Sequence, residues 1–89
     1  MPKIEIYTKS YCPHCKAAKR TLGSMGLIFE EIEVSDDPAL FQEMKQRSQR
    51  RTVPQIFVGN THIGGNSDLM KAIQNGWFKH VLSSQSATH

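Results

Sequence analysis

The residues of this sequence most able to do chemistry are two cysteines, Cys12 and Cys15, separated by two residues. The chain contains no other cysteine. A small secreted domain held together by disulfides would carry several pairs, so this pair does not form a disulfide scaffold. Three alternatives remain: a dithiol that cycles between its reduced and disulfide forms, part of a metal site, or two inert thiols.

A zinc site would need about two ligands in addition to the cysteine pair. The candidates are His62, His80 and His89, and each stands alone without a partner at the spacing that zinc sites use. We therefore expect no bound metal and favour redox chemistry. In that chemistry one thiolate attacks a disulfide, and the second thiol then resolves the covalent intermediate.

The sequence around the pair predicts a strand followed by a helix. Residues 3–8 form a short alternating run that favours a strand. Pro13 suits the first turn of a helix, which continues in good helix formers to Leu22 before two glycines stop it. Cys12 would lie at the helix N-terminus, where free N–H groups and the helix dipole favour a thiolate. Cys15 would lie one turn further along the same face as the resolving thiol.

The rest of the chain predicts further strands and helices in alternation. Residues 28–34 indicate a strand, and a helix capped by Asp36 or Asp37 should run from Pro38 to near Ser48. The remaining expected elements are a β-hairpin over residues 54–58 and 61–63, a helix from near residue 66 that ends at Gly76, and a terminal turn that docks Trp77, Phe78, Val81 and Leu82. We expect one domain over residues 1–82 and a polar tail over residues 83–89.

A cysteine pair of this spacing at the first strand-to-helix junction of a βαβ pattern is typical of the thioredoxin fold. The expected class is α/β, with the element order β-α-β-α-β-β-α. The sheet should have four strands of mixed direction, with helices on both of its faces.

Composition and charge argue against several other classes of protein. The net charge of +3 is modest, and the cluster Lys45, Arg47, Arg50 and Arg51 has no interleaved aromatic residues, so we expect no nucleic-acid partner. No apolar run approaches the roughly 20 residues that span a bilayer, and we expect no membrane association. The N-terminal residues lack the pattern of a secretory signal, which makes a cytoplasmic location the expectation.

Three segments in order resemble one known family. They are Tyr7-Thr8-Lys9-Ser10-Tyr11-Cys12-Pro13-His14-Cys15, Arg51-Thr52-Val53-Pro54-Gln55-Ile56-Phe57, and Ile63-Gly64-Gly65-Asn66-Ser67-Asp68-Leu69. Together they resemble a glutaredoxin, most closely the short bacterial-type dithiol glutaredoxins of the thioredoxin superfamily. The sequence departs from the usual family pattern at His14, where tyrosine is commonest, at Asn66 and Ser67, and at Gln49, which occupies a usual glycine.

The resemblance implies a glutathione pocket. Its residues would be Lys9, His14, Thr52, Val53, Pro54, Gly65, Asn66, Ser67 and Asp68. The Val53 backbone would pair with the cysteinyl part of glutathione, beside a cis Pro54 that faces the cysteines. The N–H groups at Asn66 and Ser67 would meet the γ-glutamyl carboxylate, and Asp68 would meet the ammonium. Lys9 would take the glycyl carboxylate with a polar residue of the second helix, for which Gln42 is a weak candidate.

The implied activity is glutathione-dependent reduction of protein disulfides and glutathione mixed disulfides, with glutathione as co-substrate and no tightly bound cofactor. The expected protein is a monomer that takes part in electron transport and cell redox homeostasis, and ribonucleotide reductase remains open as a client. Two alternatives are kept. One is an electron donor reduced by a thioredoxin reductase, and the other is an iron-sulfur carrier that uses Cys12 and glutathione.

Overall fold

Strand β1 lies inside a four-stranded sheet, and its end leads to the cysteine pair. The computed structural model describes residues 3–87. Its elements are β1 (Ile4–Thr8), α1 (Pro13–Ser24), β2 (Glu30–Glu33), α2 (Pro38–Ser48), β3 (Gln55–Val58), β4 (Thr61–Gly64), α3 (Asn66–Gln74) and α4 (Trp77–Ala87). The strand order is β2-β1-β3-β4. The β1–β2 pair is parallel and the other two pairs are antiparallel. The sheet is therefore mixed, as the sequence predicts.

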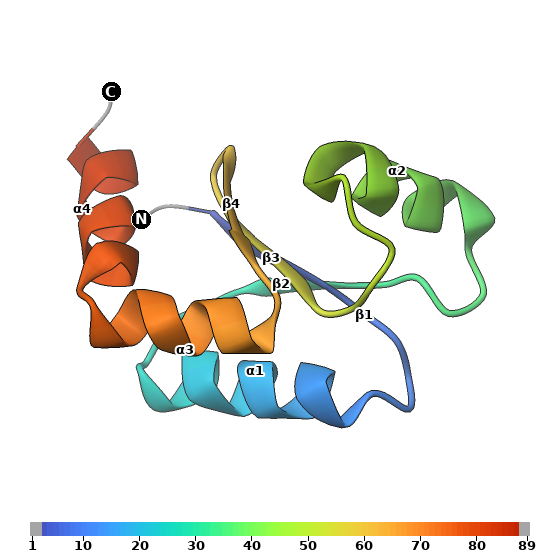
Figure 1. Cartoon of the computed structure of the whole chain (residues 1–89), viewed down its shortest axis with the longest axis horizontal. Coiled ribbons are helices and arrows are strands. Elements are labelled where there is room, and N and C mark those ends of the chain that lie inside the picture. The colour runs from blue at the N-terminus through green and yellow to red at the C-terminus, as the bar shows by residue number, and fades with distance from the viewer. Residues whose placement is uncertain (1–2, 88–89) are drawn as a thin grey trace.

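Helices cover both faces of this sheet. Figure 1 shows α1 and α3 side by side on one face and α2 on the other. The alternation along each strand separates two apolar clusters, because successive side chains of a strand point to opposite faces. The cluster beneath α1, α3 and α4 contains Ile4, Ile6, Ala18, Leu22, Ile56, Val58, Ile63, Leu69, Ala72, Phe78 and Val81. The cluster beneath α2 contains Tyr7, Val34, Met44 and Phe57. These two clusters hold the sheet between its helices and confirm the predicted fold class.

Helix α2 is capped at its N-terminus and fixed to the sheet by a polar network. Asp37 is the N-cap, and its Oδ1 accepts a hydrogen bond from the Leu40 N–H at 3.1 Å. Arg47 donates to the Tyr7 hydroxyl at 2.8 Å and to Glu5 at 3.1 Å. Burial, and then a hydrogen bond to Glu43, raises the pKa of Tyr7 to about 12, so its hydroxyl stays protonated.

The C-terminal part of the chain differs from its prediction. The expected terminal turn is a helix of 11 residues, α4, which packs against α3. The helix continues through residues 83–87, so this part of the predicted polar tail is helical. The division of the chain at residues 82 and 83 stays a prediction, and residues 88–89 lie outside the described part. No helix within residues 3–87 is long and apolar enough to cross a membrane.

Two smaller differences concern the ends of elements. Strand β2 is shorter than the predicted residues 28–34, and the side chain of Ile28 is 83% exposed. Gln49, which follows α2, has a φ of 60° and is the left-handed C-cap of that helix. Its side chain donates to the Gln46 carbonyl at 2.8 Å. Because glycine adopts this backbone region at least cost, the conformation explains why glycine is usual there in the family that the sequence resembles.

Candidate active site

The two cysteines occupy unlike positions at the start of α1. Cys12 is the N-cap, and Pro13 is in the first turn of the helix. The Cys15 N–H donates to the Cys12 Sγ at 3.2 Å. A helix N-terminus presents N–H groups and the positive end of the dipole, which stabilise a sulfur anion at this place. Cys12 is partly exposed, so its sulfur is available to a substrate.

Cys15 lies on the next turn with 1% of its surface exposed. Burial, and then a side-chain hydrogen bond with Cys12, raises the pKa of the Cys15 thiol to about 12. At neutral pH Cys15 therefore remains a protonated thiol while Cys12 faces the solvent. This asymmetry fits the predicted division into an attacking and a resolving cysteine.

The segment Thr52–Val53–Pro54 faces the cysteine pair. The Val53–Pro54 peptide bond is cis, as the family resemblance implies. The Val53 carbonyl oxygen lies 3.7 Å from the Cys12 Sγ. Pro54 is buried, Val53 is half-buried and Thr52 is exposed. The turn therefore presents the backbone carbonyl of Val53 beside the sulfur of the partly exposed Cys12.

One hollow of about 260 Å³ lies between this turn and the start of α3. It is lined by His14, Thr52, Val53, Pro54, Gly65, Asn66 and Ser67. All of them are residues that the sequence analysis assigns to a glutathione pocket. A Cβ on Gly65 would lie 3.4 Å from the Pro54 carbonyl oxygen, so the small residue keeps α3 close to the turn. Within residues 3–87, the Asn66 Oδ1 is a buried side-chain oxygen that has no hydrogen-bond partner.

Asp68 lies next to this hollow, and one of its oxygens is already engaged. Its Oδ2 accepts from the Gly65 N–H at 2.9 Å and from Arg50 at 2.8 Å. The hydrogen bond from Arg50, followed by that from Gly65, holds the pKa of the Asp68 carboxyl below its usual range. The sequence analysis placed Arg50 in a basic cluster and missed this contact, because spacing along the chain does not reveal a pairing across 18 residues.

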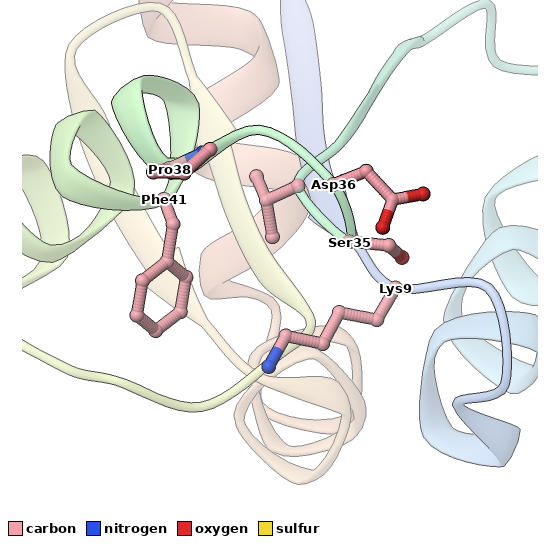
Figure 2. A pocket seen from close by; sticks show the side chains of 6 residues that line it. Lys9, Ser35, Asp36, Pro38 and Phe41 are labelled. Carbon is pink, nitrogen blue, oxygen red and sulfur yellow. The ribbon is translucent and has the colours of Figure 1, made fainter.

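Lys9 lines a second hollow, of about 370 Å³. Figure 2 shows that its side chain points toward the ring of Phe41, and the Nζ lies 5.0 Å from the ring centroid. The other lining residues are Val34, Ser35, Asp36 and Pro38. Gln42, the weak candidate from the sequence, is exposed and does not line this hollow. Phe41 lines the hollow instead. The Lys45 Nζ lies 5.2 Å from the centroid of the Phe41 ring.

A third hollow of about 620 Å³ connects these two regions in front of the exposed sulfur. Its lining residues are Lys9, Ser10, Tyr11, Cys12, Pro13, Ser35, Asp36 and Val53. It shares Val53 with the hollow at α3 and Lys9 with the hollow at Phe41. The third hollow therefore adjoins the other two through shared lining residues, and of the three it is the one that Cys12 lines. Tyr11, which is 95% exposed, stands at this surface and was not predicted as a site residue.

Chemically, this arrangement offers a sulfur nucleophile, a nearby buried thiol and a hollowed surface beside them. Within residues 3–87, no group of three or more His, Cys, Asp or Glu side chains is placed to hold a metal ion. The polar residues that line the hollow at α3 are His14, Thr52, Asn66 and Ser67, and those that line the hollow at Phe41 are Lys9, Ser35 and Asp36.

Comparisons with known proteins show which family this chain resembles. The family model described as glutaredoxin matches residues 4–63. Glutaredoxin 3 of Escherichia coli K12 is 49% identical over 82 residues, which cover 92% of this chain and 99% of the relative. A glutaredoxin of Neisseria meningitidis serogroup A is 43% identical over 84 residues, which cover 93% and 99% of the two chains.

Solved structures show the same fold. The solution structure of glutaredoxin from Brucella melitensis is 39% identical with a TM-score of 0.82, and the match covers 100% of this chain and 95% of that one. A buckwheat glutaredoxin-glutathione complex is 26% identical with a TM-score of 0.84, covering 99% and 83% of the two chains. The chain therefore belongs to the glutaredoxin family of thiol-disulfide oxidoreductases in the thioredoxin superfamily.

Proposed function

We propose that this glutaredoxin reduces glutathione mixed disulfides and protein disulfides, with glutathione as the co-substrate. The observation that carries the proposal is that the hollow lined by Cys12 adjoins one hollow at the start of α3 and another beside Lys9 and Phe41. Glutathione is an extended tripeptide with its sulfur on the central residue and charged groups at both ends. A site with a nucleophilic sulfur between two polar ends matches that shape.

The γ-glutamyl end of glutathione would lie in the hollow at the start of α3. Its carboxylate would meet the N–H groups of Asn66 and Ser67, because a helix N-terminus favours anions. Its ammonium would meet Asp68. The Asp68 Oδ2 is held by Arg50 and Gly65, so we assign the ammonium to the Oδ1.

The cysteinyl part and the glycyl end of glutathione would lie in the two adjoining hollows, beside Cys12 and beside Lys9. The cysteinyl backbone of glutathione would pair with the backbone of Val53, whose carbonyl lies near the Cys12 sulfur. The glycyl carboxylate would meet the ammonium of Lys9. Thr52 and Pro54 shape the turn at the centre, and the exposed His14 lies at its edge.

The proposed reaction starts with attack of the Cys12 thiolate on the glutathione sulfur of a mixed disulfide. A Cys12–glutathione disulfide forms, and the client thiolate leaves and takes up a proton. The thiolate of a second glutathione then attacks the bound glutathione sulfur, which releases oxidised glutathione and the Cys12 thiolate. With a protein disulfide, the Cys12 thiolate attacks one sulfur of the client, which breaks the client disulfide, frees its other sulfur as a thiolate and forms a Cys12–client mixed disulfide. Cys15 then gives up its proton and attacks the Cys12 sulfur, which expels the first client sulfur as a thiolate and forms the Cys12–Cys15 disulfide, and both client thiolates take up protons. Two molecules of glutathione then reduce that disulfide.

This reaction needs no tightly bound cofactor, since glutathione supplies the electrons. It requires surroundings in which a glutathione pool is kept reduced, and we propose a cytoplasmic location on that ground. The proposed clients are glutathionylated and disulfide-bearing proteins. Ribonucleotide reductase is one disulfide-bearing client that we would test.

The proposal can be tested with a glutathionylated peptide in the presence of glutathione, glutathione reductase and NADPH. We expect turnover by the wild type and by Cys15→Ser, and none by Cys12→Ser. With a protein disulfide as substrate, Cys15→Ser should lose activity as well. A wild type that is inactive with glutathione but active with a thioredoxin reductase would show that the assignment of the reductant is wrong.

A further inference from the structure

The side-chain amide of Gln55 connects the turn beside Cys12 to strand β4. Gln55 is fully buried at the start of β3. Its Nε2 donates to the Thr52 carbonyl oxygen at 3.0 Å and to the Thr52 Oγ1 at 3.2 Å. Its Oε1 lies 2.7 Å from the Nε2 of His62. The amide therefore holds Thr52 on one side and contacts a histidine on the other.

Hydrogen-bond chemistry fixes the roles of all three groups. A backbone carbonyl can only accept, so the amide nitrogen of Gln55 must face Thr52. The amide oxygen then faces His62, and an oxygen of this kind can only accept. The His62 Nε2 must therefore carry a hydrogen and donate it. A neutral His62 is thereby restricted to the tautomer protonated at Nε2.

The imidazole ring of His62 is held in place by its surroundings. It stacks on Phe57, with ring centroids 4.9 Å apart and an angle of 28° between the planes. The charged groups that act on it are Arg50 and Arg47, which lower its pKa, and Asp68, which raises it. Burial is the largest influence and lowers the pKa, which favours the neutral ring.

The turn at residues 52–54 precedes β3 and lies outside the ladder of the sheet. Gln55 is the first residue of that ladder, paired with Tyr7. Its side-chain amide therefore links Thr52, which lies outside the sheet, to the first paired residue of β3. Thr52 is covalently joined to Val53, whose carbonyl lies 3.7 Å from the Cys12 sulfur.

We infer that Gln55 and His62 are positioning residues for the substrate-binding turn: His62 orients the buried amide of Gln55, and that amide holds the Thr52–Val53 backbone against the site. Neither side chain touches the reacting sulfur. The inference rests on the proposed function, in which the Val53 backbone pairs with glutathione. Loss of the His62 donor leaves a buried amide oxygen without its partner, so the amide and the turn lose their fixed orientation.

Two substitutions of His62 separate the donor from the rest of the side chain. The amide nitrogen of glutamine stands as far from the backbone as the histidine Nε2, so His62→Gln should keep the donor. His62→Asn is one bond shorter and should lose it. His80→Asn is the matched control, because His80 is an exposed histidine on α4.

We expect His62→Asn to raise the KM for glutathione about tenfold while kcat changes less than about twofold. His62→Gln and His80→Asn should keep the KM of the wild type. Backbone relaxation by NMR gives a second measurement that does not depend on glutathione. The order parameter of the Val53 N–H should fall from about 0.85 toward 0.6 in His62→Asn and stay high in His62→Gln.

Two results would overturn the inference. One is a His62→Asn variant that keeps both the KM and the Val53 order parameter of the wild type, even if its thermal stability falls. The other is a His62→Gln variant that behaves like His62→Asn, because the donor would then not be the important group. If the wild type shows no turnover with glutathione, the proposed function fails, and the Val53 order parameters alone decide between these results.

Discussion

The backbone N–H of Cys15 points at the sulfur of Cys12 from 3.2 Å, whereas the side chain of Cys15 is buried. The backbone N–H of Cys15 is therefore placed to stabilise a thiolate at Cys12, while the thiol of Cys15 keeps its own proton. The two thiols of this glutaredoxin are consequently unequal before any substrate binds, and the inequality arises from position on a single helical turn.

Alkylation of the reduced protein should reveal this inequality. At pH 7.5 we expect iodoacetamide to modify Cys12 and to leave Cys15 largely unmodified, because Cys15 is buried and burial raises the pKa of its thiol to about 12. Peptide mass spectrometry can follow each site over time. In a denaturant both cysteines should react at similar rates. Equal labelling of the two cysteines in the native protein would contradict this account.

Replacement of Lys9 should weaken the binding of glutathione. In Lys9→Gln the ammonium at the hollow next to Phe41 is lost, and we expect the KM for glutathione to rise about five- to tenfold with little change in kcat. The difference from wild type should decrease as salt is added, because ions screen an exposed charge. Lys79→Gln on α4 is the matched control and should behave as wild type. If Lys9→Gln and Lys79→Gln have the same KM for glutathione, Lys9 does not belong to the binding site.

Two glycine substitutions should have opposite effects on stability. Gly64 has a φ of 117°, and a Cβ there would overlap the carboxylate of Asp68. We expect Gly64→Ala to lower the free energy of unfolding by about 2 kcal/mol or more. Gly23 lies inside α1 with no neighbouring atom within 4 Å of an added Cβ. Gly23→Ala should raise the free energy of unfolding by about 0.5–1 kcal/mol. Urea titrations of the two variants measure both changes, and a stable Gly64→Ala protein would refute the prediction.

The stability of the protein should depend on pH through His62. Burial, followed by the nearby charge of Arg50, lowers the pKa of His62 below its ordinary value of 6.5. The unfolded chain therefore binds a proton at a higher pH than the folded protein does. This contribution to stability is complete above pH 6.5 and is lost as the pH falls through the pKa of the folded state.

His62→Gln removes this titration while it keeps the hydrogen-bond donor. Between pH 7.5 and pH 5, the urea midpoint of the wild type should fall by more than that of His62→Gln. His80→Gln, at an exposed histidine, should follow the wild type. Parallel pH profiles for the wild type and His62→Gln would show that His62 makes no such contribution.

The local parts of the fold and site could be predicted because their signals lie close together in the sequence. The N-cap position of Cys12 follows from the strand before it and the proline after it. The cap of α2 was narrowed to two aspartates, and the structure selects Asp37. The glutathione pocket was carried over from the family resemblance, and seven of its residues line one hollow.

The long-range parts could not be predicted for a physical reason. Arg50 reaches Asp68, and the Gln55 amide reaches His62, only after the sheet and α3 have assembled. Phe41 and Gln42 are neighbours in sequence, and only the rotation of α2 decides which one faces Lys9. The length of helix α4 was underestimated because its last residues are serine, glutamine and alanine, which show no apolar periodicity.

The contact between Cys12 and Val53 joins residues that are 41 positions apart. A chain that emerges from the ribosome therefore carries both cysteines well before the turn that faces them has been synthesised. Until that turn docks, the thiol pair is present without the surface to which we assign substrate binding. Under the proposed function, glutathione-dependent turnover should appear only after this turn has docked, so the appearance of activity would report on the long-range assembly of the sheet.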